Sequence, residues 1–137
     1  MKLTKSHKSY FKAAKAISEL SDHKQKVGCV VVMGHKIISS GHNSKIKCHA
    51  VQARIDKERF GCECAGRIHA EIDALLPLVK NRVDLTRASI YVYRQFKDGI
   101  LALARPCEGC MSLIKQCGIK DIYYTNNGGY SHEEILY

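Results

Sequence analysis

The sequence has no tryptophan, no long apolar run and fewer acidic than basic residues. No stretch reaches the roughly 20 apolar residues that a membrane-spanning helix needs. The lysine-rich start also lacks the apolar segment of a secretory signal peptide. Internal repeats, linkers and low-complexity segments are missing as well. These absences predict a single domain over residues 1–137 that has no membrane partner.

The shortage of acidic residues leaves the protein strongly basic. Thirteen Asp and Glu residues stand against 22 Lys and Arg residues, which gives a formal net charge of +9. This charge favours anionic partners, either nucleotide phosphates or single-stranded nucleic acid. However, the lysines of the first quarter follow a predicted helix and are not interleaved with aromatic residues that could stack on bases. A solvated helix face therefore explains these lysines at least as well as nucleic-acid contact does.

Two short motifs carry most of the functional signal, H-A-E at residues 69–71 and P-C-x-x-C at residues 106–110. The first supplies an imidazole and the second two thiols, from His69, Cys107 and Cys110. One imidazole and two thiolates form a three-ligand zinc site whose fourth position stays open for water. Zinc makes that water acidic enough to react near neutral pH. Glu71 is well placed beside such a water to act as a general acid and base.

With these two motifs, the sequence resembles the cytidine and deoxycytidylate deaminase superfamily over roughly residues 27–125. That superfamily also includes tRNA adenosine deaminases and the cytosine deaminases of polynucleotides. The resemblance implies one catalytic zinc ion, held by His69, Cys107 and Cys110. It also implies that Glu71 shuttles protons while the amine of the base leaves as ammonia. The alternative is a structural zinc site beside a surface carboxylate.

Three further residues are candidates for contact with the substrate. Asn43 follows a predicted strand, where relatives often carry Gly-x-Asn, so the resemblance implies a contact with the sugar hydroxyl or the base edge. The alternative is an asparagine that tolerates a turn conformation. Ala70 is small and would leave room for a flat pyrimidine. Arg105 could bind a phosphate through two hydrogen bonds, or it could form a surface ion pair.

A second group of potential ligands consists of Cys48, Cys62 and Cys64, with His42 and His49 nearby. Some deoxycytidylate deaminases carry an extra structural zinc in a comparable region, so the resemblance allows a second zinc here. The spacing C-x13-C-x-C matches no strong zinc pattern, which favours ordinary thiols in a loop. Seven cysteines without a signal peptide fit a reducing cytoplasm better than a secreted disulfide framework.

Periodicity and turn residues predict the secondary structure. Helices are expected at residues 6–20, 68–79 and 107–117, and strands at 27–33, 36–40, 88–93, 100–104 and 119–125. Pro77 should end or bend the second helix. Asp98-Gly99 predicts a hairpin that leads into residues 100–104. Residues 131–134 have the form of a capping box that opens a final short turn.

This order of elements predicts an α/β fold, a three-layer α/β/α sandwich with a mixed sheet of about five strands. The leading hypothesis is a zinc-dependent hydrolytic deaminase of a free cytosine nucleotide similar to dCMP. The runner-up is a deaminase of cytosine or adenine in single-stranded DNA or RNA. A non-catalytic zinc module that binds nucleic acid is the third, and the intact Glu71 argues against it. The resemblance further implies a homo-oligomer.

Overall fold

The structure, a computed structural model, describes residues 2–44 and 69–137. The helices in this part of the chain are α1 (Lys5–Ser18), α3 (Ala70–Lys80) and α4 (Glu108–Gln116). The strands are β1 (Val27–Met33), β2 (Lys36–His42), β3 (Ser89–Arg94), β4 (Asp121–Asn126) and β5 (Gly129–Glu134). Among the described residues, no helix has the length and apolar character needed to cross a membrane.

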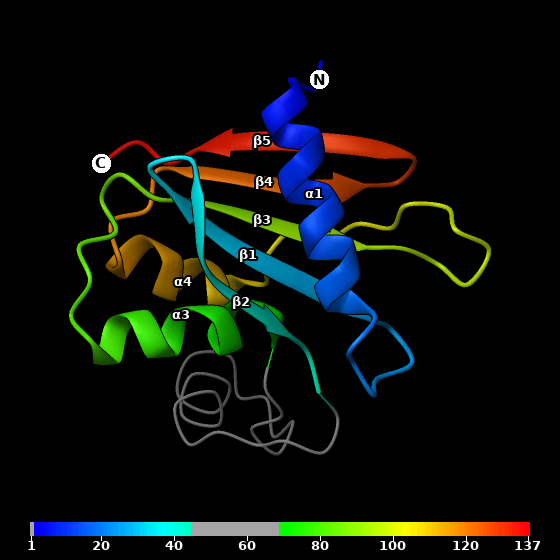
Figure 1. The fold of residues 1–137 in the computed structure, drawn as a ribbon, viewed down its shortest axis with the longest axis horizontal. Helices are drawn as coiled ribbons and strands as arrows, with labels where there is room; N and C mark the ends of the chain where they lie inside the picture. The colour runs from blue at the N-terminus through cyan, green and yellow to red at the C-terminus, as the bar shows by residue number, and fades with distance from the viewer. Residues whose placement is uncertain (1, 45–68) are drawn as a thin grey trace.

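The five strands form one mixed sheet in the order β2-β1-β3-β4-β5 (Figure 1). Strands β3 and β4 are parallel, with α4 between them in the chain, and the other neighbouring strands are antiparallel. Helix α1 crosses one face of the sheet, and α3 and α4 lie together on the other (Figure 1). The predicted three-layer sandwich is therefore confirmed.

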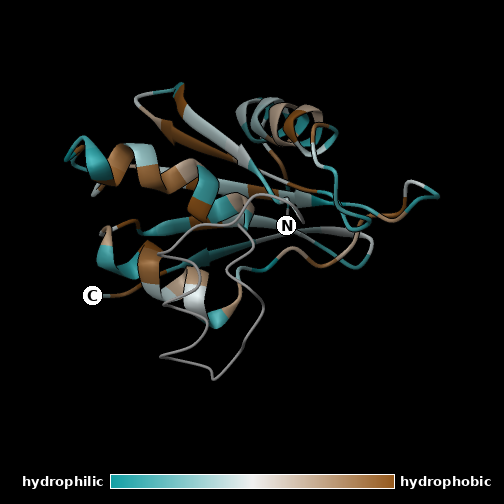
Figure 2. Ribbon diagram, turned by 90° about the horizontal axis from the view of Figure 1, so that it is seen from below, coloured by the Kyte–Doolittle hydropathy of each residue, from teal (hydrophilic) through white to brown (hydrophobic). Residues whose placement is uncertain are grey.

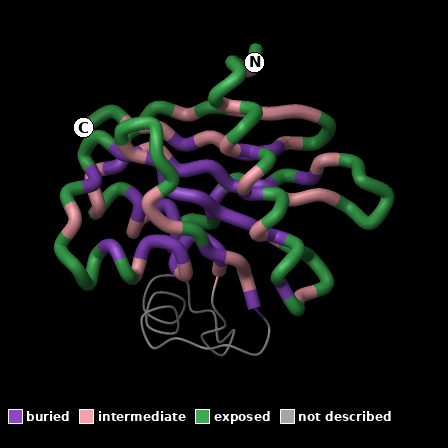
Figure 3. Tube along the Cα trace, viewed as in Figure 1, coloured by how far each residue is buried: buried purple, intermediate pink, exposed green. Residues whose placement is uncertain are grey.

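Alternating residues of the central strands supply two separate cores (Figures 2 and 3). Because successive side chains of a strand point to opposite faces, β1 and β3 each contribute to both cores. The side chains facing α3 and α4 include Cys29, Val31, Ile90 and Val92. Those facing α1 include Val30, Val32, Tyr91 and Tyr93. Both strands are covered on both faces, as the apolar run of β1 predicted.

Helix α1 agrees with the predicted amphipathic helix except at its end. Thr4 caps it, with His7 completing the capping box, and the predicted lysine face is exposed. The helix was predicted to run to residue 20, but it ends at Ser18 and Leu20 is 66% exposed. Past the last turn, a helical spacing no longer determines which way a side chain points.

Pro77 was predicted to end or bend helix α3, and it does not end the helix. The helix continues through this proline to Lys80, and Asn81 N–H bonds to the Pro77 carbonyl at 3.1 Å. The buried Leu78 holds the last turn on the core. Packing of the apolar face therefore outweighs the hydrogen bond that proline removes.

Two predictions at the sheet were wrong. Residues 100–104 form no strand; an isolated bridge joins Gln95 to Leu101 across a turn at Gly99. Residues 131–134 open no helical turn, since they belong to β5, which pairs with β4 along its length. The capping-box pattern is not used, because the hairpin that β5 forms with β4 pairs the same backbone groups. Strand β2 also runs past its predicted end to His42.

Candidate active site at the start of two helices

The candidate site lies where α3 and α4 begin. His69 is the N-cap of α3 and Cys107 is the N-cap of α4, and both have extended backbone dihedrals. Cys110 follows one turn into α4 and is completely buried. The first turn of a helix carries partial positive charge, which favours thiolate over thiol and attracts anions. The two helix starts thus bring a ring nitrogen and two sulfur atoms to one point.

The spacing of these three donors fits one tetrahedral metal ion. His69 Nδ1 lies 3.3 Å from Cys110 Sγ and 3.6 Å from Cys107 Sγ. All three ligand atoms lie within 4.8 Å of one another. Zinc–nitrogen and zinc–sulfur bonds at a tetrahedral angle would place such donors about 3.5 Å apart. His69, Cys107 and Cys110 could therefore hold zinc without rearrangement.

The two thiols differ in their ionisation. Cys107 has a pKa lowered to about 4, mainly because Cys110 Sγ donates a hydrogen bond to it, with further help from His69 and the Cys110 N–H. The same shared proton, together with burial, raises the pKa of Cys110. A thiolate is thus already favoured at the half-exposed sulfur, which is the form that a metal binds.

Glu71 lies in the first turn of α3 and is only 5% exposed. Burial raises its pKa, while the nearby His69 opposes this shift, and the carboxylate also interacts with Cys110. A surface carboxylate would be exposed, whereas Glu71 is buried and interacts with one of the two sulfurs. Glu71 is therefore part of the site.

Strand β2 holds the start of α3 from the side. A Cβ atom on Gly41 would lie 2.5 Å from the Ala70 carbonyl oxygen and 2.5 Å from the Ala74 nitrogen. Ser39 Oγ donates to the Ala74 carbonyl at 2.6 Å, and His42 N–H donates to Asp73 Oδ2 at 3.2 Å. The strand prediction stopped at residue 40, before Gly41, although glycine inside a strand is itself a signal of close backbone approach.

The predicted substrate contacts occupy different environments. Asn43 is engaged with the loop before β1: its side-chain oxygen accepts from Ser21 Oγ and Val27 N–H, and its Nδ2 donates to the Gln25 carbonyl. These hydrogen bonds give Asn43 a structural role, which was the alternative to substrate binding. A contact with the substrate stays a prediction. Ala70 is fully buried against Gly41, directly beside His69.

Arg105 forms the ion pair that was the alternative to a phosphate contact. Its Nε and Nη2 donate to the two carboxylate oxygens of Glu133 on β5, at 2.7 and 3.1 Å. This pairing raises the pKa of Arg105 and lowers that of Glu133. Cys117, at the end of α4, packs partly buried against the core. Cys48, Cys62 and Cys64, for which the resemblance allowed a second zinc and the spacing favoured ordinary thiols, lie outside the described residues.

Comparison with known proteins gives a family for this arrangement. Residues 4–126 match the family described as the cytidine and deoxycytidylate deaminase zinc-binding region. The chain is 32% identical over 101 residues to ComE operon protein 2 of Bacillus subtilis, covering 74% of this chain and 48% of that protein. It is 30% identical over 143 residues to deoxycytidylate deaminase of Schizosaccharomyces pombe, covering 93% and 40%. The chain thus spans less than half the length of these two relatives.

A shorter relative is covered almost entirely. Deoxycytidylate deaminase of Mycobacterium phage D29 is 30% identical over 124 residues, which are 81% of this chain and 87% of that protein. Among solved structures, apo dCMP deaminase from the cyanophage S-TIM5 has a TM-score of 0.64 at 25% identity, covering 92% and 86%. A cytidine deaminase from Burkholderia pseudomallei shares the fold, with a TM-score of 0.65 at 19% identity and coverage of 96% and 93%.

The family match extends over both motifs and over both helices that carry the donors. The donor set and its spacing suit the zinc ion after which the matched region is described. This chain belongs to the cytidine and deoxycytidylate deaminase family.

Proposed function

We propose that this protein is a zinc-dependent hydrolytic deaminase that converts a free cytosine nucleotide of the dCMP type to its uracil form. One observation carries the proposal: a buried carboxylate, Glu71, lies beside a converging imidazole and two thiols. A purely structural zinc site needs no such acid. The deaminases of fission yeast and phage D29 support deoxycytidylate as the substrate, because each matches most of this chain.

His69, Cys107 and Cys110 would hold the zinc ion. Zinc, when bound, lowers the pKa of a coordinated water so that it can attack carbon near neutral pH. The chain holds its ligands in place through the two helix starts. One imidazole and two thiolates leave a position open, as in catalytic zinc sites.

Glu71 moves the protons of the reaction. Hydrolysis adds one water to the amine-bearing ring carbon and releases one ammonia. The Glu71 carboxylate accepts a proton from the attacking water and delivers it to the adjacent ring nitrogen. It then takes the second proton of the same water and passes it to the departing amine. The carboxylate is therefore unprotonated again at the end of the cycle. A group that relays protons in both directions must lie next to the site, as Glu71 does.

Ammonia release from a panel of substrates tests the proposal. The zinc-loaded protein is assayed with cytosine, cytidine, dCMP, CMP and one mixed single-stranded oligonucleotide. The proposal expects dCMP to react fastest among them. Uracil or inosine appearing in the oligonucleotide while all monomers stay unreacted would instead establish the polynucleotide alternative.

Glu71→Gln supplies the matched mechanistic test. Loss of one proton-transfer group should lower kcat by about 10²–10⁴-fold, while zinc content stays at that of the wild type. Glu134→Gln, an exposed carboxylate on β5, is the control and should keep wild-type kcat. Equal kcat for Glu71→Gln and wild type would exclude the proposed role. A homo-oligomer and a cytoplasmic location stay predictions.

A further inference from the structure

Strands β3 and β4 separate just before the second motif. Their parallel pairing runs only as far as Val92 and Tyr124. Beyond that point, Ala102 N–H donates to the Arg94 carbonyl at 2.9 Å, and Ala104 N–H donates to the Thr125 carbonyl at 2.8 Å. Residues 102–104 therefore bond to the ends of both strands, although they form no strand of their own. This short segment leads directly to residues 105–107.

One buried hydroxyl links these three pieces of chain. Thr125 is 0% exposed, and its Oγ1 accepts from Arg94 N–H at 3.1 Å. The same Oγ1 lies 2.7 Å from the Ala102 carbonyl oxygen and 3.2 Å from that of Arg94. A hydroxyl has one proton, and the shorter contact makes Ala102 its main acceptor. An apolar side chain here would leave buried backbone groups of two segments without their partner.

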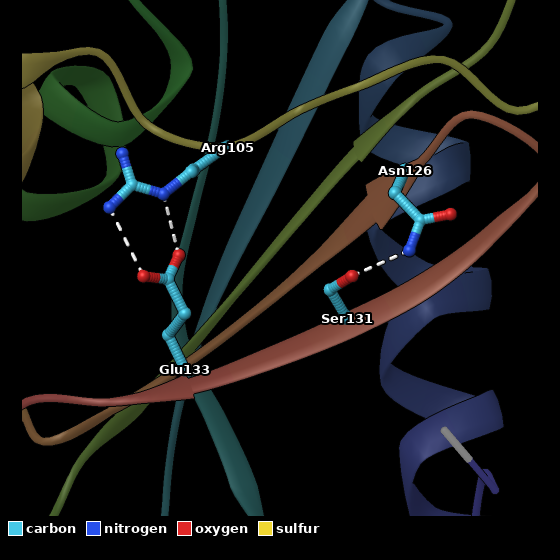
Figure 4. Close-up of polar contacts among 4 residues, drawn as sticks. All are labelled: Arg105, Asn126, Ser131 and Glu133. Carbon is cyan, nitrogen blue, oxygen red and sulfur yellow. Dashed lines mark hydrogen bonds and ion pairs between the residues drawn. The ribbon is translucent and has the colours of Figure 1, made fainter.

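Little freedom remains between this clamp and the first sulfur ligand. Only Arg105 and Pro106 separate Ala104 from Cys107. Pro106 is buried, its ring fixes φ, and it restricts the backbone of Arg105 before it. The Arg105 side chain is held by Glu133 on β5 (Figure 4).

Strand β5 is in turn tied to β4. Asn126 Nδ2 donates to Ser131 Oγ across the two strands, as Figure 4 shows beside the Arg105 ion pair. Two side-chain contacts thus add to the backbone bond from Ala104 to Thr125 in joining the pair β4–β5 to the segment before Cys107. One is the buried hydroxyl of Thr125, and the other is the partly exposed ion pair of Arg105 and Glu133. A buried contact resists thermal motion better than an exposed ion pair does, because solvent competes for the latter.

We infer that Thr125 is a positioning residue of the metal site: its hydroxyl fixes residues 102–104 and thereby the place of Cys107 relative to His69 and Cys110. Thr125 touches neither substrate nor metal in this arrangement. The inference rests on the proposed function for the identity of the metal. It deepens that proposal, because it explains how a sulfur ligand at the end of a non-repetitive segment keeps its position.

Removal of the hydroxyl with little change in shape tests the inference. Thr125→Val is compared with wild type for zinc affinity, measured by competition with a chromophoric chelator. The expected loss is about 10–100-fold, as for other residues that orient a metal ligand. The cobalt(II)-loaded protein should also show altered absorption, since those bands report how sulfur surrounds the metal. Exchange of the Arg94, Ala102 and Ala104 amide protons should accelerate.

A second pair of variants covers the case in which Thr125→Val does not fold. Thr125→Ser and Thr125→Ala both remove the methyl group, and only the serine variant keeps the hydroxyl. The serine variant should bind zinc at least about tenfold more tightly than the alanine variant. Ile122→Val, a buried apolar change in the same strand, controls for a general loss of stability and should keep zinc affinity and the cobalt spectrum.

Equal zinc affinity and equal cobalt spectra within both pairs would overturn the inference. So would a loss of the same size in Ile122→Val. These readouts do not depend on the substrate, so they are separate from the test of the proposed function. A wild-type protein that binds zinc but deaminates no nucleotide contradicts the proposed substrate and leaves the role of Thr125 to be judged by the metal alone.

Discussion

The two faces of the sheet solve the same packing task with different side chains. Under α3 and α4, the described residues of the core are almost wholly aliphatic, and Tyr124 is the one buried tyrosine among them. Under α1, aromatic rings dominate. The ring centroids of Tyr91 and Tyr123 lie 4.5 Å apart with an angle of 6° between the planes, and those of Tyr123 and His132 lie 4.4 Å apart. Phe11 meets Tyr91 edge-on from the helix.

Helices α1 and α3 nevertheless both contact the sheet closely at a glycine. A Cβ on Gly28 of β1 would lie 2.0 Å from the Ala14 carbonyl oxygen of α1. A Cβ on Gly41 of β2 would meet the backbone of α3 almost as closely. The difference is that α3 begins with a donor and a buried acid, whereas α1 begins with an ordinary capping box. The aliphatic face therefore carries the candidate metal site, and the aromatic face lies on the opposite side of the sheet.

Metal removal should separate the two faces most clearly. At a free zinc concentration 1,000 times the dissociation constant, bound zinc should add about 4 kcal/mol to the free energy of unfolding. Chelation of the zinc should remove this contribution. Amide exchange should accelerate in residues 69–75 and 107–114, while the buried part of α1 around Phe11 and Ala14 keeps its protection. Cys110→Ala is the control, since it should show no dependence on zinc. Equal acceleration on both faces would contradict the distinction.

The two glycines provide the next test. Gly28→Ala and Gly41→Ala should each lower the free energy of unfolding by about 1–3 kcal/mol, because the added methyl meets backbone atoms that cannot yield cheaply. Only Gly41→Ala should also weaken zinc binding, since it displaces the start of α3. Ser40→Ala, at an exposed position beside Gly41, is the control for both measurements. Zinc affinity that falls equally in both glycine variants would show that the faces are coupled.

The aromatic stack should contribute to stability alone. A double-mutant cycle with Tyr91→Leu and Tyr123→Leu, followed by chemical denaturation, should give a coupling of about 0.5–1.5 kcal/mol. Zinc affinity should stay at the wild-type value in the single variants, because neither ring faces the donors. A coupling near zero would mean that the ring geometry adds nothing beyond buried area.

The smallest effect is expected at Arg105 and Glu133. Both side chains are more than a third exposed, so Glu133→Gln should cost about 0.2–1 kcal/mol at neutral pH. The folded-state pKa of Glu133 is lowered from its ordinary 4.5, so this contribution is present above that value and is lost as pH falls through the folded pKa. Denaturation of wild type and variant across this range should show the difference shrink. A difference that grows toward low pH would contradict the assignment.

Local patterns predicted the individual elements well. The strand at residues 27–33 matches β1, and the helix at 107–117 matches α4 with its two caps. Such patterns depend on the spacing of residues within one segment, and folding does not change that spacing. The helix at 68–79 was also confirmed, although a rule about proline within that segment was overridden by packing.

The errors have different sources. Strand β5 was taken for a turn although it forms a hairpin with β4, and Asn127-Gly128 between the two strands is a local hairpin signal that the prediction did not use. Residues 100–104 look like a strand, yet at the point where β3 and β4 part they bond to both strand ends. Thr125 carried no signal at all, since a threonine in a strand pattern is ordinary until its neighbours are known.

The amino-acid order alone determined which donors this protein offers: one imidazole, two thiols a helical turn apart, and an acid two positions from the ring. Those identities follow from covalent neighbours and from helix geometry. His69 and Cys107 are 38 positions apart in the chain. Only the tertiary structure decided that His69 Nδ1 and Cys107 Sγ lie 3.6 Å apart and that Glu71 is buried. Such proximity depends on pairing between remote segments, in which each contact is selected by the packing of all the others.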